Sequence, residues 1–144
     1  MITTEIFHYG INKYFSQIQA GTDVGKNAEE RVKIFVDRAI AIIGEHSDFF
    51  KIYIEFMAKE AERVEAKEMI TTFFDKYIKT LGGIISEGIL DGSFRQVEAE
   101  KLARAIYFLS IGVIFTRFVM KVEFDLEDQN HFQINSILES IKNH

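Results

Sequence analysis

The sequence has 144 residues, which suits one domain large enough to bury about two-thirds of the surface of its unfolded chain. It contains no cysteine, so disulfides, thiol nucleophiles and thiolate metal sites are excluded. The net charge is −5 with acidic and basic residues interspersed, which offers no broad basic surface for nucleic acid.

The composition and the termini point to an all-helical, cytoplasmic protein. There is no proline, and the alternation typical of strands is hard to find, so an all-α chain is the economical interpretation. The first residues, Met1 to Glu5, lack the basic-then-apolar order of a signal peptide. The longest apolar run, Ala105 to Thr116, is too short to cross a bilayer. We therefore expect a buried core helix there, a cytoplasmic location and no membrane partner.

The first helix is predicted over Thr3 to Gln19. Its broad apolar stripe comprises Ile6, Phe7, Ile11, Tyr14, Phe15 and Ile18, and Gly21 closes it. Gly21 to Lys26 is polar and glycine-rich and predicts a linker.

A second helix is predicted to begin after Asn27, which forms a capping box with Glu30, and to end near Gly44 to His46. Ser47 is the predicted N-cap of a third helix. That helix is apolar on more than one side, which predicts a central position in a bundle. The mixed-charge run Lys59 to Glu68 predicts a solvated helix end and corner.

A fourth helix and a tight corner organise the rest of the chain. The helix carries apolar residues at the spacing of one face: Ile70, Phe73, Phe74, Tyr77, Ile78, Leu81, Ile84, Ile85 and Ile89. Gly92 then ends it, because glycine can take the left-handed conformation that closes a helix. The next helix should open near Val97 or Glu98, so the two helices should pack as an antiparallel hairpin.

The last two helices are expected to need a second subunit. The helix from about Glu98 to Lys121 is almost continuously apolar, and Phe108, Gly112, Phe115 and Val119 share one face. Asp125 is the predicted N-cap of a final helix whose stripe comprises Ile134, Ile137, Leu138 and Ile141. One hairpin cannot cover this much apolar surface, so we expect a homodimer.

The order of residues around the corner resembles the C-terminal regulatory domain of TetR-family transcriptional regulators. The positions that carry this resemblance are Ile85, Gly88, Gly92, Phe94, Arg95, Glu98, Leu102, Ala103, Arg104, Ala105 and Ile106. The resemblance covers most of the chain, from about Asn27 onward. It implies an antiparallel bundle of about six helices over residues 1–144, forming one regulatory and dimerisation domain. It also implies a four-helix dimer interface built from the last two helices, with Phe108, Gly112, Phe115, Val119, Ile134, Ile137, Leu138 and Ile141.

The resemblance further implies a hydrophobic small-molecule effector bound inside the bundle. An apolar cavity with a few phenol hydroxyls would suit such a ligand. The candidate lining residues are Tyr53, Phe56, Met57, Phe73, Phe74, Tyr77, Tyr107, Phe108 and Ile111, with Ser110 as a further polar candidate. Aromatic residues at helical spacing usually fill the core, which is the alternative for each of them. Arg104 and Arg117 could pair with an anionic ligand or simply lie at helix edges. The sequence lacks a compact helix-turn-helix with a basic recognition helix, so we expect no operator binding by this chain itself.

No motif proposes catalysis or a cofactor. The histidines (His8, His46, His131 and His144) are scattered, which makes metal ligation improbable, and Gly82-Gly83 is not part of a phosphate-binding loop. We predict that the protein is not an enzyme and carries no cofactor or metal. The alternative function is a stand-alone helical dimerisation or adaptor module with a filled core and a protein partner. A helical-bundle enzyme ranks last.

Overall fold

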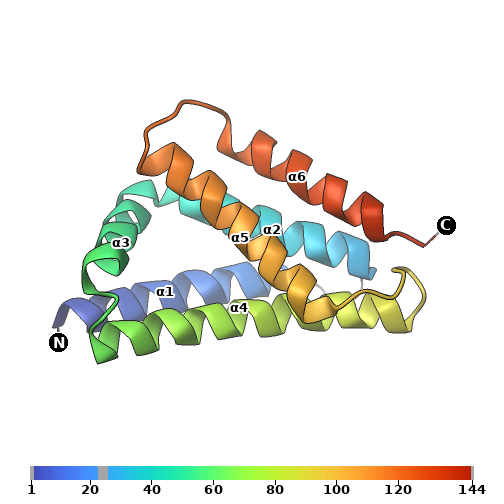
Figure 1. The fold of residues 1–144 in the computed structure, drawn as a ribbon, viewed down its shortest axis with the longest axis horizontal. Helices are drawn as coiled ribbons and strands as arrows, with labels where there is room; N and C mark the ends of the chain where they lie inside the picture. The colour runs from blue at the N-terminus through green and yellow to red at the C-terminus, as the bar shows by residue number, and fades with distance from the viewer. Residues whose placement is uncertain (1, 23–25, 144) are drawn as a thin grey trace.

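The computed structural model describes residues 2–22 and 26–143, and over these ranges the chain forms six α-helices and no strands (Figure 1). The helices are α1 (Ile2–Ala20), α2 (Ala28–Glu45), α3 (Ser47–Glu60), α4 (Val64–Leu90), α5 (Ala99–Phe118) and α6 (Leu126–Ile141). The all-α bundle predicted from the sequence is confirmed. α4 begins at Val64, six residues before the first residue of its predicted apolar face, so it takes up the second half of the predicted charged corner. The predicted linker falls partly on residues 23–25, which lie outside the described ranges.

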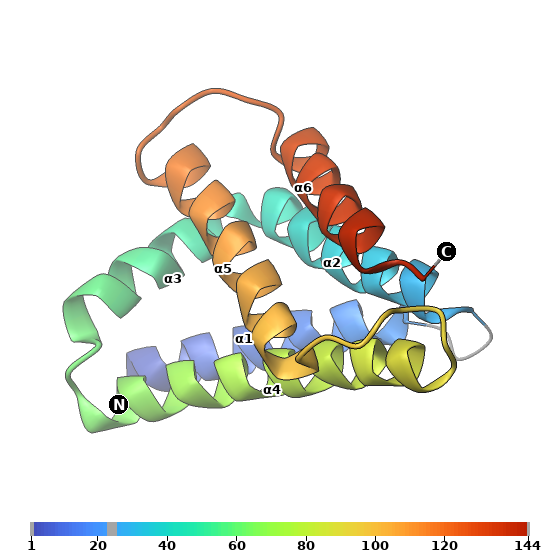
Figure 2. The ribbon, with the colours of Figure 1, turned by 45° about the vertical axis from the view of Figure 1, so that its right-hand side comes forward.

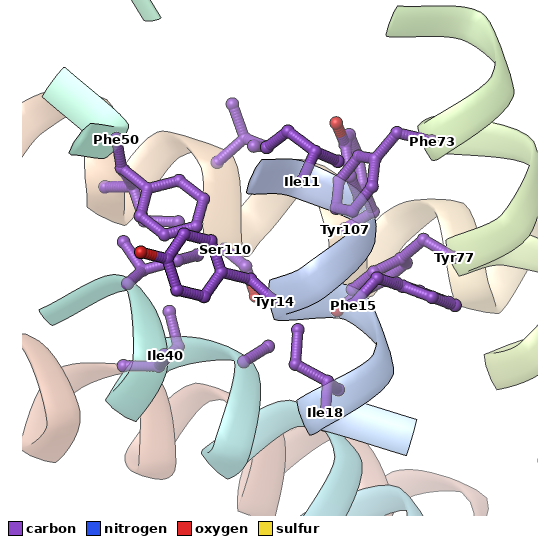
Figure 3. Close-up of a pocket in the computed structure, with 14 residues that line it drawn as sticks. Ile11, Tyr14, Phe15, Ile18, Ile40, Phe50, Phe73, Tyr77, Tyr107 and Ser110 are labelled. Carbon is purple, nitrogen blue, oxygen red and sulfur yellow. The ribbon is translucent and has the colours of Figure 1, made fainter. Parts of the chain in front are cut away.

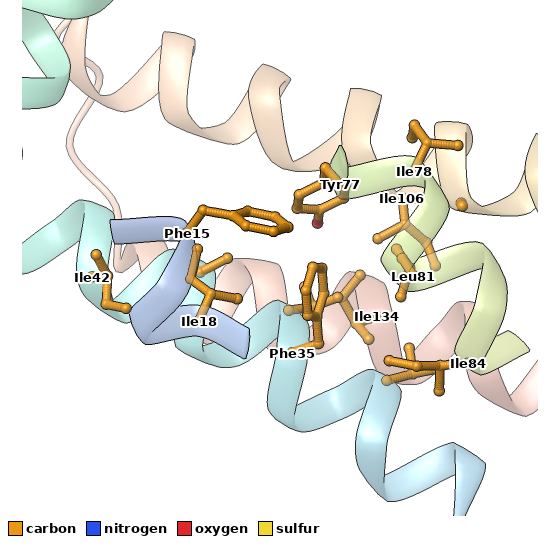
Figure 4. Close-up of a cluster of buried hydrophobic side chains, with 14 of the residues drawn as sticks. Phe15, Ile18, Phe35, Ile42, Tyr77, Ile78, Leu81, Ile84, Ile106 and Ile134 are labelled. Atoms are coloured by element: carbon orange, nitrogen blue, oxygen red, sulfur yellow. The ribbon is translucent and has the colours of Figure 1, made fainter. Parts of the chain in front are cut away.

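The helices are arranged around one apolar core. α1 and α4 lie side by side along one edge, α2 runs back beside them, and the short α3 joins α2 to α4 at one end (Figures 1 and 2). α5 crosses over this layer, and α6 packs against α2 and α5. Phe15, Phe35, Tyr77, Ile106 and Ile134 bring five of the helices together in the core (Figure 4).

Two predicted helix caps are confirmed and one is wrong. The Asn27 side chain accepts a hydrogen bond from the Glu30 backbone N–H, and the Asp125 side chain accepts one from the Asp128 N–H. Ser47 is not the N-cap of α3, because α3 already begins at Ser47. The cap position belongs to His46, whose ring packs on Tyr14 at 4.5 Å between centroids.

The central position predicted for α3 is wrong. α3 lies at one end of the bundle and buries one face only, through Phe50, Tyr53 and Phe56, while Ile52 is 56% exposed. Ile6 of α1 departs from the predicted stripe in the same way, with 60% exposure. Apolar residues all round a helix therefore do not require a central helix, because single exposed apolar side chains are common on protein surfaces.

The corner after α4 is built on two glycines and one buried ring. Gly92 takes a φ of 86°, the left-handed conformation predicted for it. The Phe94 backbone N–H donates to the Gly88 carbonyl at 2.9 Å, and the Phe94 ring is 1% exposed. A Cβ on Gly88 would overlap the Phe94 ring and lie 2.9 Å from the Cβ of Ala28. Only glycine at this position lets the ring sit against α4 and the start of α2.

The corner also holds the end of α6. The Arg95 backbone N–H donates to the Ile141 carbonyl at 2.8 Å, and its Nε donates to the Ser140 carbonyl at 3.0 Å. The Asn143 backbone N–H donates to the Ser93 carbonyl at 3.0 Å. The two Arg95 bonds satisfy carbonyls that the last turn of α6 leaves without an internal partner, and the Asn143 bond holds the residues after α6 to the corner.

The predicted α4–α5 hairpin forms only over the first half of α5. Gly82 faces Ala103, and Tyr107 packs edge-on against Phe74 at 4.9 Å between centroids. The second half leaves α4 and lies over α2 and α3, where Ile114 packs with Ile40 and Ile54. This oblique course carries α5 across the middle of the bundle.

The close approach at Gly88 is tested by Gly88→Ala. The added methyl group must displace a buried ring, so we expect a loss of about 1–3 kcal/mol in the free energy of unfolding. Gly83→Ala is the matched control in the same helix, because a Cβ there meets nothing within 4 Å. It should stabilise the protein by about 0.5–1 kcal/mol. Urea unfolding of both variants measures this, and equal effects would contradict the account of the corner.

Candidate functional site

A small cavity of about 40 Å³ lies where α5 crosses the first four helices (Figure 3). Its lining consists of Ile11, Tyr14, Phe15, Ile18, Ala39, Ile40, Ile43, Phe50, Phe73, Tyr77, Tyr107, Ser110, Ile111 and Ile114. No charged side chain is among them, and the surface of the closed cavity is carbon only. Its volume is far below the roughly 300–1,000 Å³ of a pocket for a drug-sized ligand. Any such ligand would therefore have to enlarge it.

Four of the nine predicted pocket residues line this cavity. Phe73 and Tyr77 come from α4, and Tyr107 and Ile111 come from α5. Ser110, the further polar candidate, lines it as well. The predicted convergence of α4 and α5 on an apolar space is therefore present in the structure.

The other five predicted pocket residues lie elsewhere. Tyr53 and Phe56 pack on Phe7 of α1, with ring centroids 5.6 and 4.7 Å away, and Met57 is partly buried against the core. Phe74 packs between Tyr107 and Phe108 on the outer side of the α4–α5 contact. Phe108 itself is 58% exposed. None of these five residues lines the cavity: they pack in other parts of the core or lie at the surface.

Half of the lining comes from α1 and α2, which were not expected to contribute. α1 supplies Ile11, Tyr14, Phe15 and Ile18, and α2 supplies Ala39, Ile40 and Ile43. Phe50 and Ile114 complete the additional set. Most of these residues belong to apolar stripes that the sequence displays. The stripe identifies an inward face, but it does not tell which inward residues border a space and which fill one.

The tyrosines around the cavity are held in their neutral form. Burial raises the pKa of Tyr77 well above its ordinary value, and the neighbouring Ser110 hydroxyl offsets this only in part. Burial also raises the pKa of Tyr107 to about 12, and it raises the pKa of Tyr53 beyond that. The Tyr53 and Tyr77 hydroxyls lie buried without a hydrogen-bond partner of normal geometry. At neutral pH these phenols are uncharged potential donors.

Ser110 connects the cavity to α6. Its hydroxyl donates to Asn130 Oδ1 at 3.2 Å, and the two residues are 7% and 1% exposed. Asn130 Nδ2 has no partner. Buried polar groups without partners are rare in folded proteins, so Tyr77 and Asn130 on either side of Ser110 mark this region as incompletely satisfied.

The outer face of α5 is apolar and exposed, as expected for an interface. Phe108, Phe115 and Val119 are 58%, 44% and 36% exposed, and Gly112 is exposed between them. A shallow groove beside them is lined by Phe108, Leu109, Gly112, Val113, Thr116, Phe124, Gln129 and Gln133. Residues of both α5 and α6 line this groove.

The predicted contribution of α6 to an interface needs correction. Ile134, Leu138 and Ile141 are 1–2% exposed, because the apolar stripe of α6 packs on the core of its own chain. Ile137 is partly buried against the same core. The surface that α6 offers to another molecule carries Gln129, Gln133 and the 68% exposed Phe132 instead.

The candidate anion-binding arginines are engaged on the surface. Arg104 pairs with Glu100 at 2.8 Å and Arg117 with Glu123 at 3.4 Å, and neither lines the cavity. Within the described ranges, no group of three or more His, Asp or Glu side chains is placed to hold a metal ion. The helices of the same ranges include none with the length and apolar character needed to span a bilayer.

The described residues form an all-α bundle with an internal apolar cavity and an exposed apolar face. Residues 7–140 match the family described as YsiA-like protein, C-terminal region, a TetR C-terminal domain family. The chain belongs to this family, which confirms the resemblance seen at the corner. Regulatory domains of the TetR family are generally non-enzymatic. No curated protein matches the chain.

The buried phenols predict a loss of stability at high pH. An unfolded tyrosine ionises near pH 10, whereas the folded chain keeps the Tyr77 proton to higher pH, so the free energy of unfolding falls as pH rises above about 10. The free energy of unfolding is measured with urea at pH 9 and at pH 11. Its decrease between these two pH values should be about 1 kcal/mol smaller in Tyr77→Phe than in the wild type. Tyr9→Phe, at a 73% exposed position, is the control and should behave as the wild type. Identical losses in all three proteins would contradict the burial of the Tyr77 phenol.

Proposed function

We propose that this chain is the effector-binding and homodimerisation domain of a TetR-like transcriptional regulator. The effector is a predominantly apolar small molecule that binds in the cavity between α1, α2, α4 and α5. Binding changes the arrangement of the bundle and thereby controls a DNA-binding head attached to α1. The observation that carries this proposal is a small, carbon-lined cavity in a chain of this family.

The place of α1 supports a route from the cavity to such a head. Four of its side chains form one wall of the cavity, so a ligand that enlarges the space by moving this wall displaces α1. Its C-terminal end is held to α2, where the Arg38 guanidinium donates to the Gln17 carbonyl through Nη2 at 2.7 Å. A ligand shifts the population of states by its difference in affinity for them, and displacement of α1 supplies such a difference.

The exposed face of α5 supports the dimer. Phe108, Gly112 and Phe115 form a stripe along which another helix can approach closely, and the small Gly112 leaves room for a larger side chain. The groove beside this stripe continues onto α6 through Gln129 and Gln133. A second copy that covers this face would remove a contiguous apolar surface from water.

A cavity-filling variant tests the ligand site. Thermal-shift measurements with a panel of apolar compounds should find some that raise the melting temperature, since a ligand that prefers the folded state stabilises it. Ala39→Leu adds three carbons at the cavity wall and should abolish this rise. Ala58→Leu, at an exposed position of α3, is the control and should retain it. Equal responses in both variants would place the compounds outside the cavity.

Charges on the α5 face test the dimer. We expect the wild type to sediment at twice the 16.7 kDa of one chain. Phe108→Glu with Phe115→Glu should raise the dissociation constant by at least about 100-fold, because each carboxylate would be buried without a partner. Ile52→Glu, at a similarly exposed position of α3, is the control and should leave the dimer intact. A monomeric wild type would refute this part of the proposal.

The small cavity favours a second candidate function. A volume of about 40 Å³ is close to a filled core, which suits a helical dimerisation or adaptor module whose partner is another protein. This alternative predicts that no compound of the apolar panel raises the melting temperature, while the α5 face still mediates association.

A further inference from the structure

The cavity is apolar at its surface, yet unsatisfied polar groups lie directly behind that surface. The Tyr77 side chain is 4% exposed, and its hydroxyl finds no acceptor of normal hydrogen-bond geometry. Ser110, which lines the cavity beside it, donates its proton to Asn130 and so offers no donor of its own. The Asn130 amide adds a second buried donor without a partner.

The Tyr77 hydroxyl and the Asn130 amide therefore each lack an acceptor; the Ser110 oxygen could accept a hydrogen bond but does not lie in normal hydrogen-bond geometry to either group. A buried donor that gave up its hydrogen bond to water and found no partner costs roughly 1–3 kcal/mol, and native structures rarely tolerate it without a reason. The closed cavity cannot supply the acceptor, because its surface is carbon only. A ligand that enlarges the cavity moves the wall in which the Tyr77 and Ser110 hydroxyls lie, and it can place an oxygen there.

The charge of that oxygen follows from the surroundings. None of the residues that line the cavity is cationic. Arg104 and Arg117 pair with glutamates on the surface. The Lys76 ammonium lies outside the lining, 5.8 Å from the centroid of the Phe15 ring, where it donates to Asn12 Oδ1. An anionic group buried here would have no counter-charge in contact with it, which is far costlier than burying a neutral group. A neutral acceptor, in contrast, restores the missing hydrogen bond without this cost.

We propose that the effector is an uncharged, largely apolar molecule with one carbonyl-type oxygen, which accepts a hydrogen bond from the Tyr77 hydroxyl at the Ser110 end of the cavity. Tyr77 is the specificity-determining residue. Asn130 is a positioning residue, because it holds the Ser110 hydroxyl from behind. This inference rests on the proposed function, since it names the chemical class of ligand for the same cavity.

The test uses three probes of matched shape: cumene, acetophenone and benzoate. They share a benzene ring and differ in a three-atom substituent that is apolar, neutral with one carbonyl oxygen, or anionic. Dissociation constants are measured by NMR titration of the full chain, followed through the signals of cavity-lining residues. The wild type should bind acetophenone about tenfold more tightly than cumene, the ratio expected for one recovered hydrogen bond to an otherwise unsatisfied donor, and benzoate most weakly.

Two Tyr→Phe variants show which hydroxyl causes the preference for acetophenone over cumene. Tyr77→Phe removes the hydroxyl and keeps the ring, so the acetophenone-to-cumene ratio should fall to about one. Tyr53→Phe removes the other buried, unpartnered phenol, which does not line the cavity, and the ratio should stay near tenfold. Both variants lose a hydroxyl that makes no hydrogen bond, so both should melt at or above the wild-type temperature, which verifies that they fold.

The outcomes separate the two proposals. Equal binding of cumene and acetophenone by the wild type, tightest binding of benzoate, or an unchanged ratio in Tyr77→Phe would each overturn the inference while leaving an apolar effector site in place. Failure of all three probes to shift the signals of cavity residues would overturn the effector site itself, and the inference with it.

Discussion

The packing of Phe94 on Gly88 is the contact on which the arrangement of the other helices depends. It fixes the corner after α4 against the start of α2 through Ala28, and the next residue, Arg95, ties the corner to the end of α6. The corner thereby determines where α5 begins and against which helices α6 comes to rest. Because α5 starts from a fixed point and crosses the bundle obliquely, its middle covers the space between α1, α2 and α4 (Figure 2). The cavity is a consequence of this crossing, because helices that cross obliquely leave gaps between them, and here the side chains do not fill the gap completely.

Local signals in the sequence predicted the elements well. The Asn27 and Asp125 caps, the left-handed Gly92 and the stripe of α4 each depend on residues within a few positions of one another, so a single chain suffices to identify them. The corner motif is local in the same sense. It combines a glycine, a buried ring and an arginine within eight residues, which is why it also revealed the family.

Partner choice between helices was harder to predict, because it depends on how the helix axes cross. Tyr53 and Phe56 have the same inward spacing as Phe50, yet only Phe50 reaches the cavity, while the other two pack on Phe7 of α1. Likewise, the stripe of α6 looks like an interface in the sequence, but Ile134 and Leu138 complete the core of their own chain. An apolar stripe indicates that a helix face is covered. It does not indicate whether the same chain or a second chain covers that face.

The small volume of the closed cavity is itself part of the physical case for regulation. A site that is already open binds its ligand with little change elsewhere, whereas a nearly filled site can bind only in a rearranged state, so occupancy and conformation become linked. α1 is the helix most suited to move, because its inner side chains form one wall of the cavity. Its hydrogen bonds to α4 are exposed: Lys76 donates to Asn12 at 3.3 Å, and Gln19 donates to Thr80 at 3.3 Å. Exposed bonds of this kind exchange with water at little net cost. The apolar contacts of α1 therefore dominate its attachment, and these are the contacts that a ligand in the cavity would replace with its own.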